Sequence, residues 1–347
     1  GDISGNNLYA TNNLHTTSIT ATGDISCNIL NINSSKIISD ISDNYVFTDI
    51  NSFTNNSGNI NVGIGTNCLT NNTTGFRNVG VGAYTLNSNT SGIRNVAVGA
   101  SVLANNTTGN LNVGVGSSPL FNNDSGSYNV GVGSYSLLSN TIGNNNTALG
   151  WNSLVSNTTG AANTACGSQA LWASTSSINN TAVGCRALCY TTTGANNTAN
   201  GCFALENNTT GNYNVGIGKY ALNSNITGYN NTALGSLAIL NAKNSYNNTA
   251  VGMSALLVDT TGIANTTIGA FSAAFTGTGS YNTAHGVYAL YNNKFGNRNM
   301  ALGNYALYTA ISNDDNLAIG DSALYLIQGT TNTSVGESSM RLATTGN

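Results

Sequence analysis

The stretch Asn-Thr-Ala-Leu-Gly-Trp-Asn-Ser-Leu-Val-Ser-Asn-Thr-Thr-Gly at residues 146–160 belongs to a 17-residue repeat that decides the fold. Its opening follows the pattern Asn-[Val/Thr]-[Gly/Ala]-x-Gly. With few substitutions, this pattern begins at Asn61, Asn78, Asn95, Asn112, Asn129, Asn146, Asn163, Asn180, Asn197, Asn214, Asn231, Asn248, Asn265, Asn282, Asn299, Asn316 and Asn332. Only the last step is 16 residues long. A fixed period of this kind indicates stacked structural units that contact mainly their neighbours.

The first five positions of each repeat, counted from its Asn, alternate in size. Positions 2 and 4 carry mostly Val, Thr, Ile or Leu, whereas positions 3 and 5 carry mostly Gly or Ala. This alternation predicts a β-strand with positions 2 and 4 on one face, which we expect to point into the core. The opposite face is nearly bare. It predicts close packing against a second sheet or against the backbone of another chain.

The rest of the repeat predicts a second apolar segment and a turn. Position 9 is Leu in fourteen of the seventeen copies and is expected to point inward from a short strand or a tight bend. Positions 12 to 15 read Asn-x-Thr-Gly or close to it, as at residues 157–160. Asn and Thr side chains bond to nearby backbone and Gly permits positive φ, which favours a turn. In a stack, the asparagines of position 1 are expected to form an amide ladder.

The expected fold class is therefore all-β, a parallel β-solenoid or β-roll. Each 17-residue rung would hold two short strands and two turns, since the glycines and β-branched residues disfavour a helix. Seventeen rungs at about 4.8 Å would give a rod of about 80 Å. We divide the chain into a β-rich fibre-shaft segment (1–36), a junction or N-terminal cap (37–60) and the solenoid of seventeen repeats (61–347).

A single rung has a small core, which favours an assembly of several chains. Three inward apolar side chains contribute roughly 1.5–3 kcal/mol each. Ordering the backbone of the rung costs roughly 1–2 kcal/mol for each of its 17 residues, which exceeds that contribution. We therefore expect sister chains to cover the bare Gly/Ala face, with a homotrimer as the predicted assembly.

Composition and charge exclude several functions. Only 6% of the residues are charged and the net charge is -3, so no basic face is available for nucleic acid. No apolar run approaches 18 residues, so no membrane span is expected. The acidic residues are scattered and no rung carries the Asp of calcium-binding β-rolls. We predict no catalytic, cofactor-binding or metal-binding residues and no enzymatic activity.

A few residues leave two interpretations open. Asp314 and Asp315 are either solvated turn residues or a catalytic pair. His285 and Asn200 take the inward position 4, where His285 is a packing variant or a ligand and Asn200 needs a polar partner such as water or another chain. Cys185 and Cys202 occupy the same place in successive repeats and are either bridged or free.

Two sets of surface residues also have two interpretations. The Asn-x-Thr/Ser turns are formal glycosylation acceptors or simply turns, and they lie at Asn72, Asn89, Asn106, Asn123, Asn157, Asn208 and Asn225. Tyrosines at positions 7 and 17 either stack on sugars or cover the rung edges, and they are Tyr84, Tyr128, Tyr135, Tyr213, Tyr220, Tyr288 and Tyr305.

The repeat at 146–160 and again at 231–240 resembles the arrays of phage and large-virus fibre proteins that precede an endosialidase-type intramolecular chaperone. It is similar, more distantly, to the β-roll heads of trimeric autotransporter adhesins. The resemblance covers residues 61–347 well and 1–60 loosely. It implies a trimeric, elongated fibre on a virion or in the extracellular space. A downstream chaperone that cleaves itself off is part of the same implication.

These observations together predict a structural fibre or adhesin that attaches to a host surface. Its expected partners are two further copies of the chain, host-surface glycans or a receptor, and an anchoring protein on a virion or cell. A bacterial surface adhesin or an extracellular filament is the alternative. A carbohydrate-active solenoid enzyme lacks a clustered acid pair. An ice-binding protein needs threonines two apart on a flat strand, whereas doublets such as Thr158-Thr159 are adjacent and lie in a turn.

Overall fold

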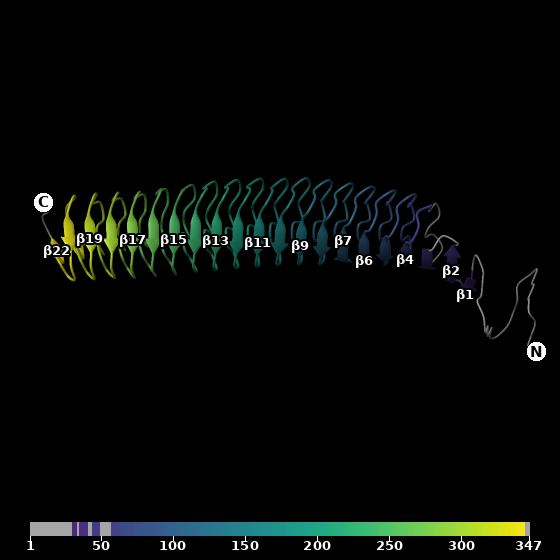
Figure 1. Ribbon diagram of the computed structural model, residues 1–347, viewed down its shortest axis with the longest axis horizontal. Coiled ribbons are helices and arrows are strands. Elements are labelled where there is room, and N and C mark those ends of the chain that lie inside the picture. The colour runs from purple at the N-terminus through teal and green to yellow at the C-terminus, as the bar shows by residue number, and fades with distance from the viewer. Residues whose placement is uncertain (1–29, 33–34, 41–43, 49–56, 344–347) are drawn as a thin grey trace, which may run out of the picture.

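The described part of the chain is a gently curved rod of stacked rungs that contains strands and turns but no helix (Figure 1). The computed structural model describes residues 30–32, 35–40, 44–48 and 57–343. Its strands are β1 (Leu30–Ile32), β2 (Ser35–Asp40), β3 (Asn44–Thr48), β4 (Val62–Ile64), β5 (Val79–Val81), β6 (Val96–Ala100), β7 (Val113–Ser117), β8 (Val130–Val132), β9 (Thr147–Leu149), β10 (Thr164–Cys166), β11 (Thr181–Val183), β12 (Thr198–Asn200), β13 (Val215–Ile217), β14 (Thr232–Leu234), β15 (Thr249–Val251), β16 (Thr266–Ile268), β17 (Thr283–His285), β18 (Met300–Leu302), β19 (Leu317–Ile319), β20 (Leu326–Ile327), β21 (Thr333–Val335) and β22 (Leu342–Ala343).

One strand per repeat joins a single long sheet in which equivalent positions lie side by side. Ala165, for example, lies between Ala148 and Ala182 in the parallel register β9–β10–β11. The series continues from β4 to β19 and ends with β21, and this confirms a parallel β-solenoid with a period of about 17 residues. At the other end β3 pairs parallel with β4, and β1, β2 and β3 pair antiparallel. Residues 1–29 lie outside the described residues, so the division into shaft and junction stays a prediction.

In each repeat strand, the side chain of position 3 points into the core. This is the face of the strand that we expected to be nearly bare. In β9, Ala148 at position 3 is fully buried, whereas Thr147 is half-buried and Leu149 is 37% exposed. Position 3 is the buried position in every repeat strand. The prediction that positions 2 and 4 fill the core is therefore wrong. Leu154 and the other residues of position 9, except Met340 on the last rung, are buried as expected, and they fill the narrow interior so that mostly small residues fit opposite them.

Residue volumes inside the rod compensate one another. A Cβ atom on Gly114, at position 3, would lie 2.3 Å from Cγ1 of Val102, at position 8 of the preceding rung, so Val102 leaves no room for a methyl group at Gly114. The opposite exchange occurs where the buried Thr267 replaces Ala at position 3. In that rung Ala273 replaces the usual Leu at position 9. The wall of the same chain, rather than a sister chain, therefore covers the Gly/Ala face.

The segment around position 9 is a bend rather than a second strand. In each of the first fifteen repeats, three non-glycine residues at positions 7, 9 and 17 adopt left-handed backbone conformations, as Asn152 (φ 54°), Leu154 (φ 49°) and Ala162 (φ 57°) do. The bend still bonds to the next rung, since the Leu154 N–H donates to the Ala170 carbonyl at 3.0 Å. A second strand occurs only in the last two repeats, where β20 and β22 pair in parallel. For the other rungs the expectation of two strands is wrong, and the alternative of a tight bend with an inward Leu is correct.

Positions 5 and 15 carry glycine for different physical reasons. Gly150, at position 5, has φ 132°, and a Cβ atom there would lie 2.7 Å from the Gly167 carbonyl oxygen of the next rung. Position 15 does not use positive φ, contrary to expectation. A Cβ atom on Gly143 would instead lie 2.4 Å from Oδ1 of Asn140 at position 12. Where position 12 is smaller, position 15 is no longer Gly, as in the pairs Ser174 and Ser177, Ala242 and Ser245, and Ala310 and Asn313.

Two columns of asparagines run through the rod. In the first column, Oδ1 of Asn163 accepts the backbone N–H of Asn180 at 3.0 Å and its side-chain amide at 3.2 Å. The Asn180 amide also donates to the Gly194 carbonyl at 2.8 Å. The position-1 asparagines are at most 2% exposed, and they form the predicted amide ladder. In the second column, at position 12, the Asn106 amide donates to Oδ1 of Asn89 at 2.7 Å.

Candidate functional site

The outer sheet face, defined by positions 2 and 4 of β4 to β19 and of β21, extends along the whole stack of repeats. Its position 4 is apolar except at Asn200 and His285, whereas its position 2 is Val, Met or Leu in eight repeats and Thr in nine. No Asp, Glu, Lys or Arg occupies either position in any repeat. In β4 to β8 both positions carry only Val or Ile. Large apolar residues of position 4 that are exposed include Ile64, Val98, Val115, Val132, Leu149, Ile217, Leu234, Ile268, Ile319 and Val335. An exposed column of apolar side chains of this length is typical of an interaction site.

This face replaces the surface on which we expected sister chains to pack. The Gly/Ala side is closed inside the rod, where its residues contact the bend of the same chain. The Val, Ile and Leu side chains that we placed inside are outside. The prediction that sister chains cover the Gly/Ala side is therefore wrong.

Asn200 and His285 lie on the outer sheet face and are exposed, rather than inside as predicted. Asn200 sits between Val183 and Ile217 of the neighbouring strands. His285 sits likewise between Ile268 and Leu302. The two residues are the polar interruptions of the position-4 column.

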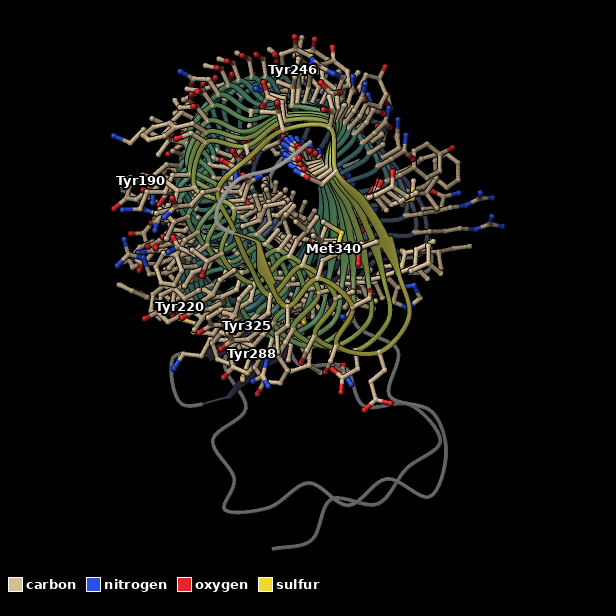
Figure 2. The ribbon with its side chains drawn as sticks, turned by 90° about the vertical axis from the view of Figure 1, so that its left-hand side faces the viewer. Tyr190, Tyr220, Tyr246, Tyr288, Tyr325 and Met340 are labelled. Atoms are coloured by element: carbon tan, nitrogen blue, oxygen red, sulfur yellow. The ribbon has the colours of Figure 1, made fainter. Side chains whose placement is uncertain are left out.

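A second surface feature, here called the aromatic corner, consists of two columns of rings on the last rungs. Its residues at position 7 are Phe271, Tyr288 and Tyr305, and its residues at position 10 are Tyr291, Tyr308 and Tyr325. Within each column the ring centroids lie 4.9–5.3 Å apart in nearly parallel planes. Figure 2 looks along the rod and shows Tyr288 and Tyr325 at the same corner of the cross-section.

Stacking within the aromatic corner determines which parts of its rings remain open to a ligand. Successive rings cover one another's faces, and the face is the part of a ring on which a sugar stacks. The corner therefore fits the interpretation that tyrosines cover rung edges. At position 17, by contrast, Tyr128 and Tyr213 expose 59% and 62% of their surface. Tyr281, which the sequence argument omitted, is equally open at 59%. The repetition of Tyr at position 10 in three consecutive copies was the missed signal of the corner.

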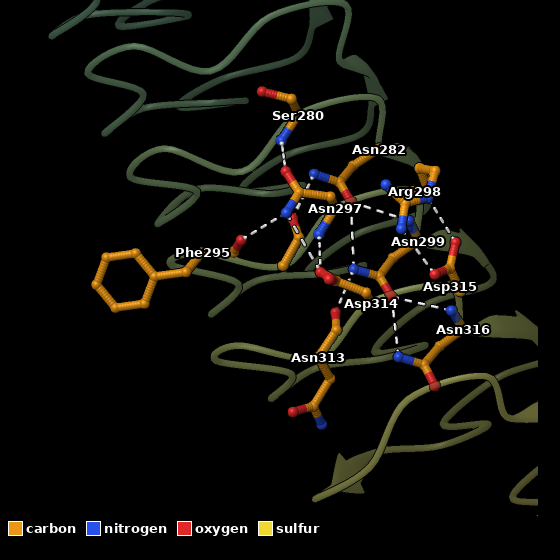
Figure 3. A network of polar contacts seen from close by, with 11 residues as sticks. Ser280, Asn282, Phe295, Asn297, Arg298, Asn299, Asn313, Asp314, Asp315 and Asn316 are labelled. Carbon is orange, nitrogen blue, oxygen red and sulfur yellow. Dashed lines mark hydrogen bonds and ion pairs between the residues drawn. The ribbon is translucent and has the colours of Figure 1, made fainter.

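The acidic pair Asp314 and Asp315 joins neighbouring rungs (Figure 3). Oδ1 of Asp314 accepts the backbone N–H of Asn297 at 2.6 Å. Arg298 donates from Nε and Nη2 to the two carboxylate oxygens of Asp315 at 2.6 and 2.8 Å. These hydrogen bonds hold the pKa of Asp315 below its usual value. Each carboxylate has its own partner in the preceding rung, which favours the turn interpretation of this pair.

Cys185 and Cys202 are both free thiols, so the bridged interpretation is wrong for this structure. The neighbouring Arg186 forms an ion pair with Glu206 at 2.8 Å, and its guanidinium lies 5.6 Å from the ring centre of Tyr190. Desolvation raises the pKa of the Cys202 thiol. A raised pKa disfavours the thiolate, which is the reactive form.

The formal glycosylation acceptors lie inside the rod. Their side chains belong to the position-12 column and are fully buried, and they are Asn72, Asn89, Asn106, Asn123, Asn157, Asn208 and Asn225. The amides of Asn106 and Asn123, for example, donate to the preceding asparagine at 2.7 Å. A sugar on such a nitrogen would displace the column, so the structure supports the turn interpretation.

Asp259 places a carboxyl group in the same buried column. Its Oδ1 accepts the Gly262 N–H at 2.6 Å, and its Oδ2 accepts the Asn248 amide at 3.1 Å. Burial raises the pKa of Asp259 to about 8. Ala242 takes the equivalent place in the preceding rung, so no amide from that side compensates the carboxylate. Asp259 is one of the scattered acidic residues of the sequence, and its burial was not predicted.

No family model, no curated protein and no solved structure matches the chain. Within the described ranges, no group of three or more His, Cys, Asp or Glu residues is arranged to hold a metal ion. The same ranges contain no helix with the length and apolar character of a membrane span.

Proposed function

We propose that the chain is the rod of a homotrimeric structural fibre that stands on a virion or a cell surface and attaches to a host surface. The observation that carries this proposal is the outer sheet face, which exposes a column of mostly apolar side chains at position 4, lacks Asp, Glu, Lys and Arg, and is as long as the stack of repeats. Covering apolar surface stabilises an assembly by roughly 25 cal/mol per Å². Three rods that turn this face toward a common axis would hide it from water.

The rung construction suits a mechanical role. Backbone and asparagine hydrogen bonds join each rung to the next, so a load along the rod is shared by many equivalent bonds. In this proposal the chain transmits length and rigidity from an anchoring protein to a host contact. It performs no catalysis.

Attachment would come from repeated weak contacts along the outside. The exposed rings of Tyr128, Tyr213 and Tyr281 recur at position 17 and offer open faces to host glycans. Three chains per fibre multiply these contacts, and linked sites bind far more tightly than single ones.

Light scattering of the intact protein tests the assembly. We expect a mass three times that of the 35.4 kDa chain, and rods about 80 Å long in electron micrographs. A monomeric mass would contradict the proposal.

Binding to a glycan array tests attachment. The double variant Tyr213→Ser and Tyr281→Ser should lose most of the signal, whereas Asn230→Ser, at the same position of another rung, should retain it. Equal binding by both variants would rule out the tyrosine contacts.

A further inference from the structure

We propose that copies of this chain pack through the outer sheet face in parallel and in register, and that Asn200 and His285 set this alignment. The inference rests on the proposed fibre and adds its geometry. We assign the face to a second copy of the same surface, because such a copy has the same rung spacing and the same length and brings no Asp, Glu, Lys or Arg into the contact.

The size of the face fits this occupant. Seventeen strands at about 4.8 Å, each three residues of about 3.3 Å wide, give a footprint of about 800 Å². This is about the area that each partner contributes to a stable interface of standard size. The face also lacks Asp, Glu, Lys and Arg, whose burial would oppose such packing.

Asn200 makes the register specific. In an in-register assembly whose symmetry axis runs along the position-4 column, Asn200 meets Asn200 of the other copy, and the two amides can bond to each other. A slip by one rung would bury this amide against Val183 or Ile217, which offer no polar side-chain partner. A buried polar group without a partner is disfavoured, and a single Asn fixes the alignment of coiled coils for the same reason.

His285 makes the direction specific. Asn200 belongs to the ninth of the seventeen repeats, so it meets itself in a parallel and in a fully overlapping antiparallel pair. His285 belongs to the fourteenth repeat. It would meet His285 in the parallel pair but Val115, in the fourth repeat, in the antiparallel one. Only the parallel arrangement pairs both polar residues with themselves.

Crosslinking of the native Cys166 can test this arrangement. Cys166 occupies position 4 of the seventh repeat and is partly exposed on the outer sheet face. A variant that keeps Cys166 and replaces Cys27, Cys68, Cys185, Cys189 and Cys202 by Ala should form covalent dimers with a short bis-maleimide. In a trimer, two chains of every three would be linked. A variant that keeps only Cys185, which lies outside the face, is the matched control and should stay uncrosslinked.

The antiparallel alternative predicts a different product. There, Cys166 would face Leu234 of the eleventh repeat. Chains that keep only Cys166 are therefore co-expressed with Cys-free chains that carry Leu234→Cys. We expect links between two Cys166 side chains and none between Cys166 and the Leu234→Cys site. The mixed product, or the absence of any Cys166 product in a sample that light scattering shows to be oligomeric, would overturn the inference and leave the fibre proposal standing. A monomer would overturn both.

The role of the two polar residues has its own test. The double variant Asn200→Val and His285→Leu should keep the oligomeric mass but yield the mixed antiparallel product beside the parallel one. Val251→Leu, also at position 4, should retain the pure parallel pattern. An unchanged pattern in the double variant would show that Asn200 and His285 do not set the alignment.

Discussion

The side-chain oxygen of Asn163 accepts both the backbone N–H and the side-chain amide of Asn180, at 3.0 and 3.2 Å. One buried amide per rung thus satisfies the donor groups of the next rung, at a corner where the strand begins. The interior of this rod is therefore as much a hydrogen-bonded column as an apolar core. Because buried polar groups need partners, each asparagine depends on the rung beside it.

Removal of one column member should open the rod locally. Asn163→Ala leaves the Asn180 N–H without its acceptor and the Ser177 carbonyl without its donor, at a cost of about 2–4 kcal/mol. We expect lower protection from hydrogen exchange in the two neighbouring rungs. The exposed Asn105→Ala is the control, with an expected change below about 0.5 kcal/mol. Equal effects of the two variants would contradict the role of the column.

Asp259 should make the twelfth rung sensitive to pH. Its pKa rises from an ordinary 3.8 to about 8 in the folded chain. Between these pH values the folded chain keeps the Asp259 proton that the unfolded chain releases. The free energy of unfolding is therefore highest below about pH 4 and decreases up to about pH 8. The decline is at most about 1.4 kcal/mol per pH unit.

Asp259→Asn should remove this decline, because it restores the neutral amide of the other rungs. We expect the variant to be more stable than the parent at pH 8.5 and to differ little from it at pH 4. Urea midpoints at the two pH values provide the measurement. A parent chain and variant with parallel pH profiles would show that Asp259 is not buried as a neutral acid.

The glycines of position 3 should differ in their tolerance of a methyl group. Gly114→Ala places a Cβ atom 2.3 Å from Val102 and should cost about 1–3 kcal/mol. Gly216→Ala places it 3.3 Å from the nearest Leu205 atoms, and Gly216 is not in a positive-φ conformation, so the change should be nearly neutral or stabilising. Thermal unfolding of both variants tests the compensation between positions 3 and 8. A larger loss from Gly216→Ala would reverse our interpretation.

The left-handed residues of position 17 should favour glycine. Ala162 has φ 57° and is exposed, so Ala162→Gly should stabilise the rod by about 0.5–1 kcal/mol. Its neighbour Ala161 pairs with Ile178 and is not in a positive-φ conformation. Ala161→Gly should therefore destabilise the rod by a similar amount. Melting temperatures that move in the same direction for both variants would contradict the backbone explanation.

The sequence by itself determined the period, the parallel stacking and the asparagine ladder. These properties depend on repetition: if one rung stacks on the next, equal positions must meet, whichever way their side chains point. The inward Leu of position 9 followed from its apolar character. The compensating pairs at positions 12 and 15, such as Ala242 and Ser245, were also readable in the sequence but were not used.

Only the tertiary structure decided which side of the strand faces inward. Hydrophobicity alone places Val98 and Leu149 inside and Gly or Ala outside, because it does not measure the space available. The opposite wall already contributes Leu154 to an interior one large side chain wide, so Ala148 fits opposite it and a larger residue does not. The bulky side chains are therefore turned outward, and the limited volume inside the rung creates the surface through which we expect the rods to meet.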